Sequence, residues 1–249
     1  MKKLNKKKLI FIPIIILFTL CLLFFMYVYS GVYTGDYTSQ KDLLDATNVN
    51  IENTDYITFT PKDQSNNIGF IFYPGGKVTA DAYAPLMKKI SENGFKVIIP
   101  KMPFNLAVFS PNKADGIINK NPEIHTWVIG GHSLGGTMAA SYAYNNPDKI
   151  TGLIMYASYP QDKHNFKDRN ISVLSLYGSE DGVASLANIE NSKNLFPSSA
   201  VFNVIQGGNH GNFGNYGNQK GDHESLITRE GQQTQTLKFT ADFLNNLSN

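Results

Sequence analysis

The chain has 249 residues, enough for one sizeable domain and few for two. Hydrophobic residues make up 42% and charged residues 17%, as in a globular protein. The formal net charge of +2 includes five lysines among the first eight residues, and subtracting these five leaves −3 for the remainder. No basic surface is implied, and no interleaving of basic with aromatic residues points to nucleic-acid binding.

An apolar run from Leu9 to Tyr29 follows the basic segment 1–8. A bilayer core needs about 20 apolar residues, whereas the apolar region of a cleaved signal peptide has roughly 7 to 15. We therefore expect a transmembrane anchor over 9–29, with cleavage and secretion as the alternative. Five lysines precede the run, and Lys41 is the first basic residue after it, so we expect a cytoplasmic N-terminus and an extracytoplasmic domain. Cys21, the only cysteine, lies in this run, which leaves the remaining chain without disulfides.

Residues 30–54 are polar and predict a stalk that leads into the fold, with a helical turn at 42–46. The domain proper is expected over 55–249. A polar turn at 61–67 separates two β-rich runs, Tyr56–Thr60 and Ile68–Tyr73. Further predicted elements are a helix at 81–93, a strand at 95–100, a helix at 113–120, a strand from Trp127, strands at 152–157 and 171–177, a helix at 183–195, a strand at 201–206 and a terminal helix marked by Leu237, Ala241, Leu244 and Leu247.

Strands that alternate with helix-length segments predict parallel βαβ units with right-handed crossovers. The expected fold class is therefore α/β, with a mostly parallel central sheet and helices on both faces. Only about 13 residues separate the strands that end at Ala157 and begin at Ile171. That short connection leaves no room for a cap domain, so we expect any site to be open and to prefer small or water-soluble molecules to long-chain lipids.

The pentapeptide Gly131-His132-Ser133-Leu134-Gly135 fits the G-x-S-x-G pattern of a nucleophile elbow. A serine at a sharp strand-to-helix turn sits in strained backbone, and its neighbours two before and two after must be small. Small residues continue into the following segment at Gly136, Ala139, Ala140 and Ala143. The pattern predicts Ser133 as a nucleophile, whereas an ordinary glycine-rich turn is the structural alternative.

A nucleophilic serine needs a base and an acid that orients the base, both at the carboxyl ends of later strands. Asp181 follows the predicted strand 171–177, and His210 follows the strand 201–206. The order Ser, Asp, His is that of the α/β-hydrolases. We predict a triad of Ser133, Asp181 and His210, with Glu180 as the less favoured acid.

The other four histidines are not expected to act as the base. His132 is assigned a packed or hydrogen-bonded structural role, and His125 precedes the elbow strand at the opposite end of the sheet. His164 and His223 lie in polar segments and are expected to face solvent. No second ligand cluster supports a metal site at residues 222–224, so no metal is expected.

The oxyanion of an acyl-transfer reaction needs two N–H donors. We expect the backbone N–H of Leu134 to be one of them. Gly76 is the expected second donor and Lys77 its runner-up, because the Pro-Gly-Gly-Lys run 74–77 follows the strand 68–73. The candidates for lining the pocket are Phe213 and Tyr216, which follow the predicted base His210 in the sequence. Both could equally pack on the sheet edge.

Apolar residues in the loop 101–123, among them Phe104, either line an acyl pocket or plug the sheet edge.

Five short sequence segments resemble those of α/β-hydrolases, in particular a small bacterial group related to dienelactone hydrolase. These segments are 72–76, 103–107, 130–136, 177–182 and 207–210. The resemblance runs from about Asn48 to the C-terminus and implies the fold, a Ser-Asp-His mechanism and no cofactor. Dienelactone hydrolases use a cysteine nucleophile, whereas this chain has Ser133.

Together these patterns predict a membrane-anchored serine hydrolase that cleaves an ester or related acyl bond of a small-molecule substrate. A peptidase or an acyltransferase would use the same residues. Outside enzymology, the alternative is a surface binding protein on a hydrolase scaffold.

Overall fold

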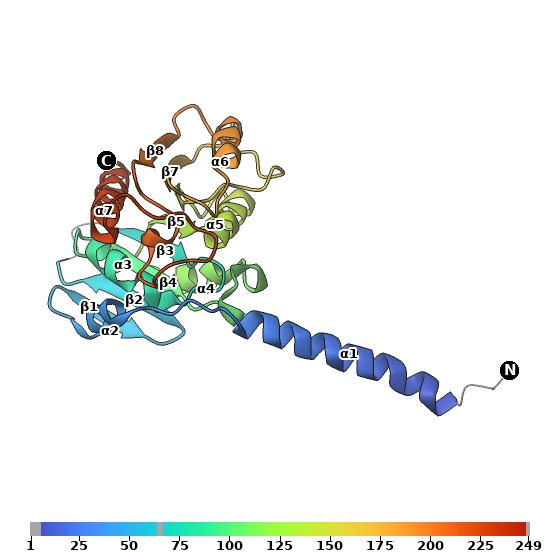
Figure 1. Ribbon diagram of the computed structural model, residues 1–249. Helices are drawn as coiled ribbons and strands as arrows, with labels where there is room; N and C mark the ends of the chain where they lie inside the picture. Colours follow the sequence, from blue (N-terminus) through green and yellow to red (C-terminus); the bar gives the residue numbers. More distant parts are fainter. Residues whose placement is uncertain (1–5, 64–66, 248–249) are drawn as a thin grey trace. The chain divides into compact units, whose positions relative to one another are not determined.

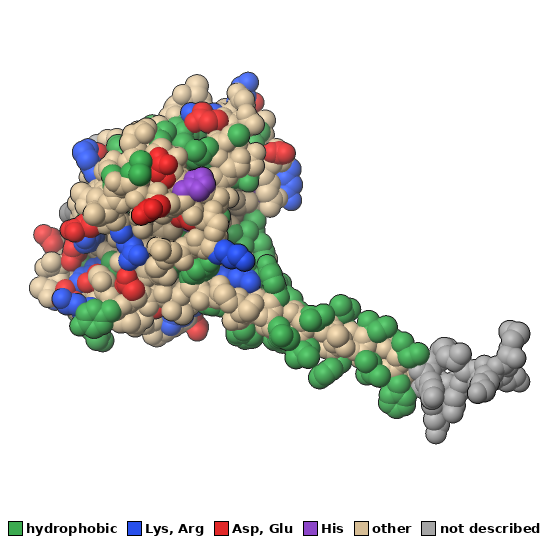
Figure 2. Space-filling view, viewed as in Figure 1, with side chains coloured by type: hydrophobic (Ala, Val, Ile, Leu, Met, Phe, Trp, Pro, Cys, Tyr) green, Lys and Arg blue, Asp and Glu red, His purple; other side chains and the backbone are tan. Residues whose placement is uncertain are grey.

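The computed structural model describes residues 6–63 and 67–247 and divides into two units, Met1–Val32 and Tyr33–Asn249. The first contains helix α1 (Lys6–Tyr29). Its segment Phe11–Tyr29 has a mean hydropathy of 2.7 and is long and apolar enough to cross a membrane, a property that signal sequences share. Figure 2 shows hydrophobic side chains along this helix. The first part of the predicted basic segment, residues 1–5, lies outside the described residues.

The second unit is built on an eight-stranded sheet with the strand order β1-β2-β4-β3-β5-β6-β7-β8 (Figure 1). The strands are β1 (Val49–Asn53), β2 (Tyr56–Pro61), β3 (Ile68–Tyr73), β4 (Lys96–Pro100), β5 (Thr126–His132), β6 (Gly152–Tyr156), β7 (Ser172–Gly178) and β8 (Val201–Ile205). The pairs β1–β2 and β2–β4 are antiparallel, and all the others are parallel. The prediction of a mostly parallel sheet is confirmed.

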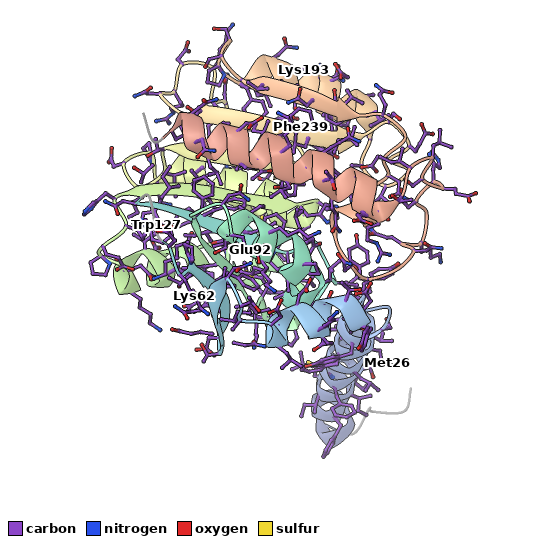
Figure 3. All side chains as sticks on the ribbon, turned by 90° about the vertical axis from the view of Figure 1, so that its left-hand side faces the viewer. Met26, Lys62, Glu92, Trp127, Lys193 and Phe239 are labelled. Carbon is purple, nitrogen blue, oxygen red and sulfur yellow. The ribbon has the colours of Figure 1, made fainter. Side chains whose placement is uncertain are left out.

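Helices cover both faces of this sheet. The helices are α2 (Tyr37–Leu44), α3 (Ala84–Ser91), α4 (Lys113–Lys120), α5 (Leu134–Asn145), α6 (Leu186–Ser192) and α7 (Arg229–Asn246), with short 3-10 helices η1 (Ala80–Tyr83), η2 (Pro103–Asn105), η3 (Ala107–Phe109), η4 (Lys193–Leu195) and η5 (Gly211–Phe213). Buried side chains of α3 and α7 share one core cluster, and those of α4 and α5 share another. Figure 3, where Glu92 follows α3 and Phe239 lies on α7, shows these two helices on the same face.

The strands that carry the two core clusters read as continuous apolar runs because both faces are covered. All six residues of β3 are buried, and so are all five of β6. Alternate side chains of β3 supply the two clusters, with Phe70 and Phe72 on the side of α3 and Ile71 and Tyr73 on the side of α5. These two buried strands pair with the two sides of β5, whose carboxyl end leads to Ser133.

Most predicted elements occur within two residues of their expected bounds, and α4 matches residues 113–120. The predicted helix at 183–195 instead begins at Leu186, after its cap Ser185. The cause is local, because Oδ1 of Asp181 accepts the backbone N–H groups of Val183 and Ala184 and turns the chain there. Residues 64–66 of the predicted turn at 61–67 lie outside the described residues.

The segment expected as a stalk is largely folded, because the second unit begins at Tyr33. Helix α2 starts at Tyr37 rather than at Asp42, since Asp36 caps it by accepting the N–H of Ser39 at 3.1 Å. The sequence analysis also missed β1, an edge strand. Its composition, Val-Asn-Ile-Glu-Asn, carries only two residues that favour strands. The connection between the two units is therefore short and centres on residues 30–32.

Candidate active site

Ser133 lies at the junction of β5 and α5 in a strained backbone conformation. Its φ of 52° and ψ of −125° fall outside the regions that side-chain-bearing residues normally adopt. The backbone N–H of Ser133 donates to the carbonyl of Tyr156 at 2.9 Å, which ties the turn to the end of β6. The side chain is half-buried. This is the geometry that the G-x-S-x-G pattern predicts.

The two glycines of the pattern permit a close passage of strand and helix. A Cβ atom on Gly135 would lie 2.2 Å from the carbonyl oxygen of Tyr73 and 2.3 Å from that of Pro74. A Cβ atom on Gly131 would lie 2.6 Å from the same Tyr73 oxygen. Real side chains do not approach backbone so closely, so glycine is required at both positions.

Asp181 and His210 form a buried pair at the carboxyl ends of β7 and β8. Nδ1 of His210 lies 2.9 Å from Oδ2 of Asp181, and both side chains are fully buried. Because an ionised carboxylate can only accept, Nδ1 is the donor, and in the neutral form of the imidazole the lone pair is then on Nε2. Nε2 is buried and has no hydrogen-bond partner among the described residues. Glu180, the less favoured acid, instead accepts from the hydroxyl of Ser179 at 2.8 Å.

The loop after β3 brings one backbone N–H group next to the elbow. The N–H of Gly75 donates to the hydroxyl of Tyr83 at 3.1 Å, and that of Lys77 donates to the carbonyl of Asn105 at 2.8 Å. For the N–H of Gly76, no acceptor occurs in the part of the chain that the structure describes. A Cβ atom on Gly76 would lie 3.1 Å from the side chain of Leu134, so the loop and the elbow are in contact.

His132 packs directly behind His210, a contact that the sequence analysis did not foresee. Its ring centroid lies 4.4 Å from that of His210, and its Nδ1 lies 2.8 Å from the hydroxyl of Tyr83. Burial lowers the pKa of His132 well below its usual value, and the neighbouring His210 lowers it further. His132 is therefore neutral. Tyr83 links it to Gly75, which precedes Gly76 in the loop after β3.

Helix α7 holds the loop that carries His210. The side chain of Gln232 is fully buried and forms two hydrogen bonds with the backbone of Asn209, accepting from its N–H at 3.0 Å and donating to its carbonyl at 2.8 Å. Gln233 donates to the side chain of Asn215 at 2.8 Å. The sequence does carry a pattern that indicates this polar role of α7, and the sequence analysis missed it. Gln232, Thr236 and Thr240 recur at helical spacing on the buried face of α7, where apolar residues are expected.

Phe213 and Tyr216, the aromatic residues that follow His210, are part of the core. Phe213 is fully buried and stacks on Tyr156 at a centroid distance of 5.3 Å, and Tyr216 is 7% exposed. The structure thus favours the packing alternative for both. Phe104 is half-buried and packs edge-on against the ring of Phe109 at 5.5 Å. Its φ of 54° is that of a turn, and the next residue, Asn105, accepts the backbone N–H of Lys77 from the loop after β3 at 2.8 Å.

Two expectations about the surroundings of the site are resolved by the structure. His164 is buried with its ring 5.0 Å from that of Tyr144, so the expectation that it faces solvent is wrong. The polar composition of its loop gave no indication that the His164 ring packs on α5.

Residues 157–171, all described, form neither helix nor strand, so no cap domain is inserted between β6 and β7.

Comparison with known proteins places the chain among hydrolases. A model of the alpha/beta hydrolase family matches residues 69–234. No curated protein sequence matches the chain. A CIB-like hydrolase from Thermoplasma acidophilum is a similar solved structure, with a TM-score of 0.61 at 18% identity over 80% of this chain and 98% of that one.

Two further similar structures are lipases. A soluble variant of monoglyceride lipase from Saccharomyces cerevisiae has a TM-score of 0.60 at 12% identity, covering 80% of this chain and 95% of its own. A monoacylglycerol lipase from Paleococcus ferrophilus has a TM-score of 0.59 at 14% identity, covering 76% and 98%. At these identities the likeness establishes a common fold.

Proposed function

The chain belongs to the alpha/beta hydrolase family, and from that premise we propose that it is a serine hydrolase that cleaves an ester or related acyl bond. One observation carries this proposal. A buried Asp181–His210 pair stands at the same edge of the sheet as a strained serine turn. The resemblance to the dienelactone hydrolase group supports the same reaction type, with serine in place of cysteine.

The proposed reaction follows from the atoms that the site presents. Oγ of Ser133 attacks the substrate carbonyl while Nε2 of His210 takes the hydroxyl proton, and Asp181 stabilises the imidazolium that forms. The tetrahedral intermediate expels its leaving group, which receives the proton from His210. Water then attacks the acyl-serine with His210 again as the base, which releases the acid and restores Ser133.

The backbone N–H groups of Leu134 and Gly76 are the proposed oxyanion donors. Leu134 opens α5, so its N–H has no partner within the helix. Gly76 is preferred over Lys77 because the N–H of Lys77 already donates to Asn105. Each such donor is typically worth about 3 kcal/mol of transition-state stabilisation.

We assign small acyl groups as the preferred substrates because no cap covers the site. The test is a panel of nitrophenyl esters from acetate through butyrate to palmitate, run on the wild type and on Ser133→Ala. The expected result is Ser133-dependent turnover that is highest with the short esters. Turnover of peptide substrates alone, or of no acyl substrate at all, would contradict the assignment.

Membrane anchoring through α1, with the lysines inside and the hydrolase domain outside, is part of the same proposal. It is supported by the apolar segment Phe11–Tyr29 and by the lysine asymmetry. A site for a specific protease placed at residues 30–32 tests it. Protease added to intact cells should release the domain, and protection of the domain while an outward-facing control is cut would contradict it.

A further inference from the structure

One carboxylate outside the proposed triad collects four backbone N–H groups. Oδ1 of Asp222 accepts from Gly182 at 3.0 Å, from His210 at 3.2 Å and from its own neighbour His223 at 3.0 Å. Oδ2 accepts from Gly211 at 2.8 Å. Hydrogen bonds to an ionised carboxylate are shorter and stronger than those between neutral groups.

Three of these four N–H groups belong to the loops that carry the proposed acid and base. Gly182 directly follows Asp181, and the other two are those of His210 and Gly211, whereas the fourth is that of His223, next to Asp222 itself. Asp222 therefore bridges the loop after β7 and the loop after β8. These loops are also joined by the side-chain bond between Asp181 and His210, so a shift of either loop would change that bond.

The same contacts give Asp222, the first residue of the Asp-His-Glu segment 222–224, a role within the chain. Both oxygens of Asp222 face N–H donors, whose dipoles present positive charge to the carboxylate. A cation at these oxygens would have to displace those donors. The Asp222 carboxylate is thus a hydrogen-bond acceptor for backbone N–H groups of the chain itself.

We propose that Asp222 is a positioning residue that holds the acid and base loops in register, so that His210 and Asp181 keep the geometry needed for proton transfer. The inference rests on the proposed function, because it assigns a role in the same site. Asp222 acts through the backbone and does not touch the substrate. Displacement of about 1 Å at a reacting group costs on the order of 100-fold in rate, which makes such a residue consequential.

Two substitutions grade the effect. In Asp222→Asn the carbonyl oxygen can keep the three donors on the Oδ1 side, while the amide group faces the N–H of Gly211 and loses that bond. Asp222→Ala removes all four acceptor contacts. The matched control is Glu224→Gln, which removes a negative charge two residues away. Glu224 is exposed and accepts no hydrogen bond from the described residues.

We expect kcat for a nitrophenyl ester to fall about 10-fold in Asp222→Asn and about 100-fold in Asp222→Ala, with KM within about twofold of wild type. Glu224→Gln should match the wild type. A second readout is the downfield proton resonance of the Nδ1–H group of His210, identified by its loss in Asp181→Asn. We expect it to shift or broaden in both Asp222 variants while circular dichroism shows a folded protein.

The two readouts separate this inference from the proposed function. If the wild type shows no Ser133-dependent turnover, the proposed function fails, and the proton resonance still reports whether Asp222 positions His210. A folded Asp222→Asn protein with wild-type kcat and an unchanged resonance would overturn the inference. A lowered melting temperature with both readouts unchanged would overturn it as well, since Asp222 would then only stabilise the loop.

Discussion

The elbow (residues 131–135) and the loop around the proposed base His210 (residues 207–211, the base loop) lie at the same edge of the sheet. They are held in place by different means. At the elbow, backbone passes so close to backbone that only glycine fits, as the contacts of Gly131 and Gly135 with Tyr73 show. The base loop is held by polar side chains that lie later in the chain. Asp222 is 12 residues from His210, whose N–H it accepts, and Gln232 is 23 residues from Asn209. The elbow is specified by five consecutive residues, whereas the base loop depends on side chains that reach it only in the folded chain.

The largest expected effect tests whether the two regions act together. Ser133→Ala, His210→Ala and Asp181→Asn should each lower kcat/KM by about 10⁴-fold without unfolding the protein, because the three groups work as a unit. For the same reason, the double mutant Ser133→Ala/His210→Ala should lose little beyond the worse single mutant. Kinetic assays with circular dichroism provide the measurement.

A histidine far from both regions supplies the control for these variants. His125 is exposed and lies before β5, at the end of the sheet opposite the elbow. His125→Ala should keep wild-type turnover. Near-normal turnover of His210→Ala, or loss of activity in a folded His125→Ala protein, would show that the base has been assigned wrongly.

The next effect concerns the core beneath the base loop. Phe213→Ala removes a fully buried ring stacked on Tyr156 and should lower the free energy of unfolding by about 3 to 5 kcal/mol. The preference among acyl lengths should not change. Tyr216→Phe, which removes only the hydroxyl bond to Gln219, should cost about 1 kcal/mol. A changed acyl preference at unchanged stability would place Phe213 in the pocket instead.

Gly135→Ala tests the packing that defines the elbow. The added methyl group meets two backbone carbonyls that cannot move aside, so we expect a loss of about 3 kcal/mol in the free energy of unfolding. Gly116→Ala in α4 is the matched control, because its nearest neighbour is the hydroxyl of Tyr56 at 3.2 Å, the end of a movable side chain. Equal stability of the two variants in urea denaturation would refute the packing account.

A smaller effect on stability than that of Gly135→Ala is expected for the polar support of the base loop. Gln232→Met keeps the length of the side chain but leaves the N–H and carbonyl of Asn209 unpaired, at a cost of about 2 kcal/mol. We also expect kcat to fall about 10-fold, because Asn209 precedes the base. Gln235→Met, an exposed position on the same helix, should have wild-type stability and turnover. A Gln232→Met protein like its control would mean that the loop is held without α7.

The sequence was sufficient for features that depend on neighbouring residues. Buried strands such as β3 appear as apolar runs, and the elbow appears as a spacing of glycines around Ser133. The pairing of Asp181 with His210 could be inferred because parallel strands end at one edge of the sheet. Each of these inferences needs only local pattern or the general topology of α/β folds.

The features that the sequence analysis missed depend on contacts between distant residues. The contact of Tyr83 with His132 joins residues 49 apart, and no local pattern marks either as a partner. Strand β1 is stabilised by its antiparallel pairing with β2 rather than by its own composition. Asp222 was considered only as part of a metal site at residues 222–224, because its donors Gly182 and Gly211 come close to it only in the folded chain.

Mapping of a fluorophosphonate probe tests the central claim, an activated nucleophile at Ser133, most directly. The wild-type protein should gain one probe mass, located by peptide mass spectrometry on the peptide that contains Ser133. Ser133→Ala should remain unlabelled, and His210→Ala should label far more slowly, because Oγ then lacks its base. Labelling of the Ser133→Ala protein at the wild-type rate, or no labelling of folded wild-type protein, would contradict the account.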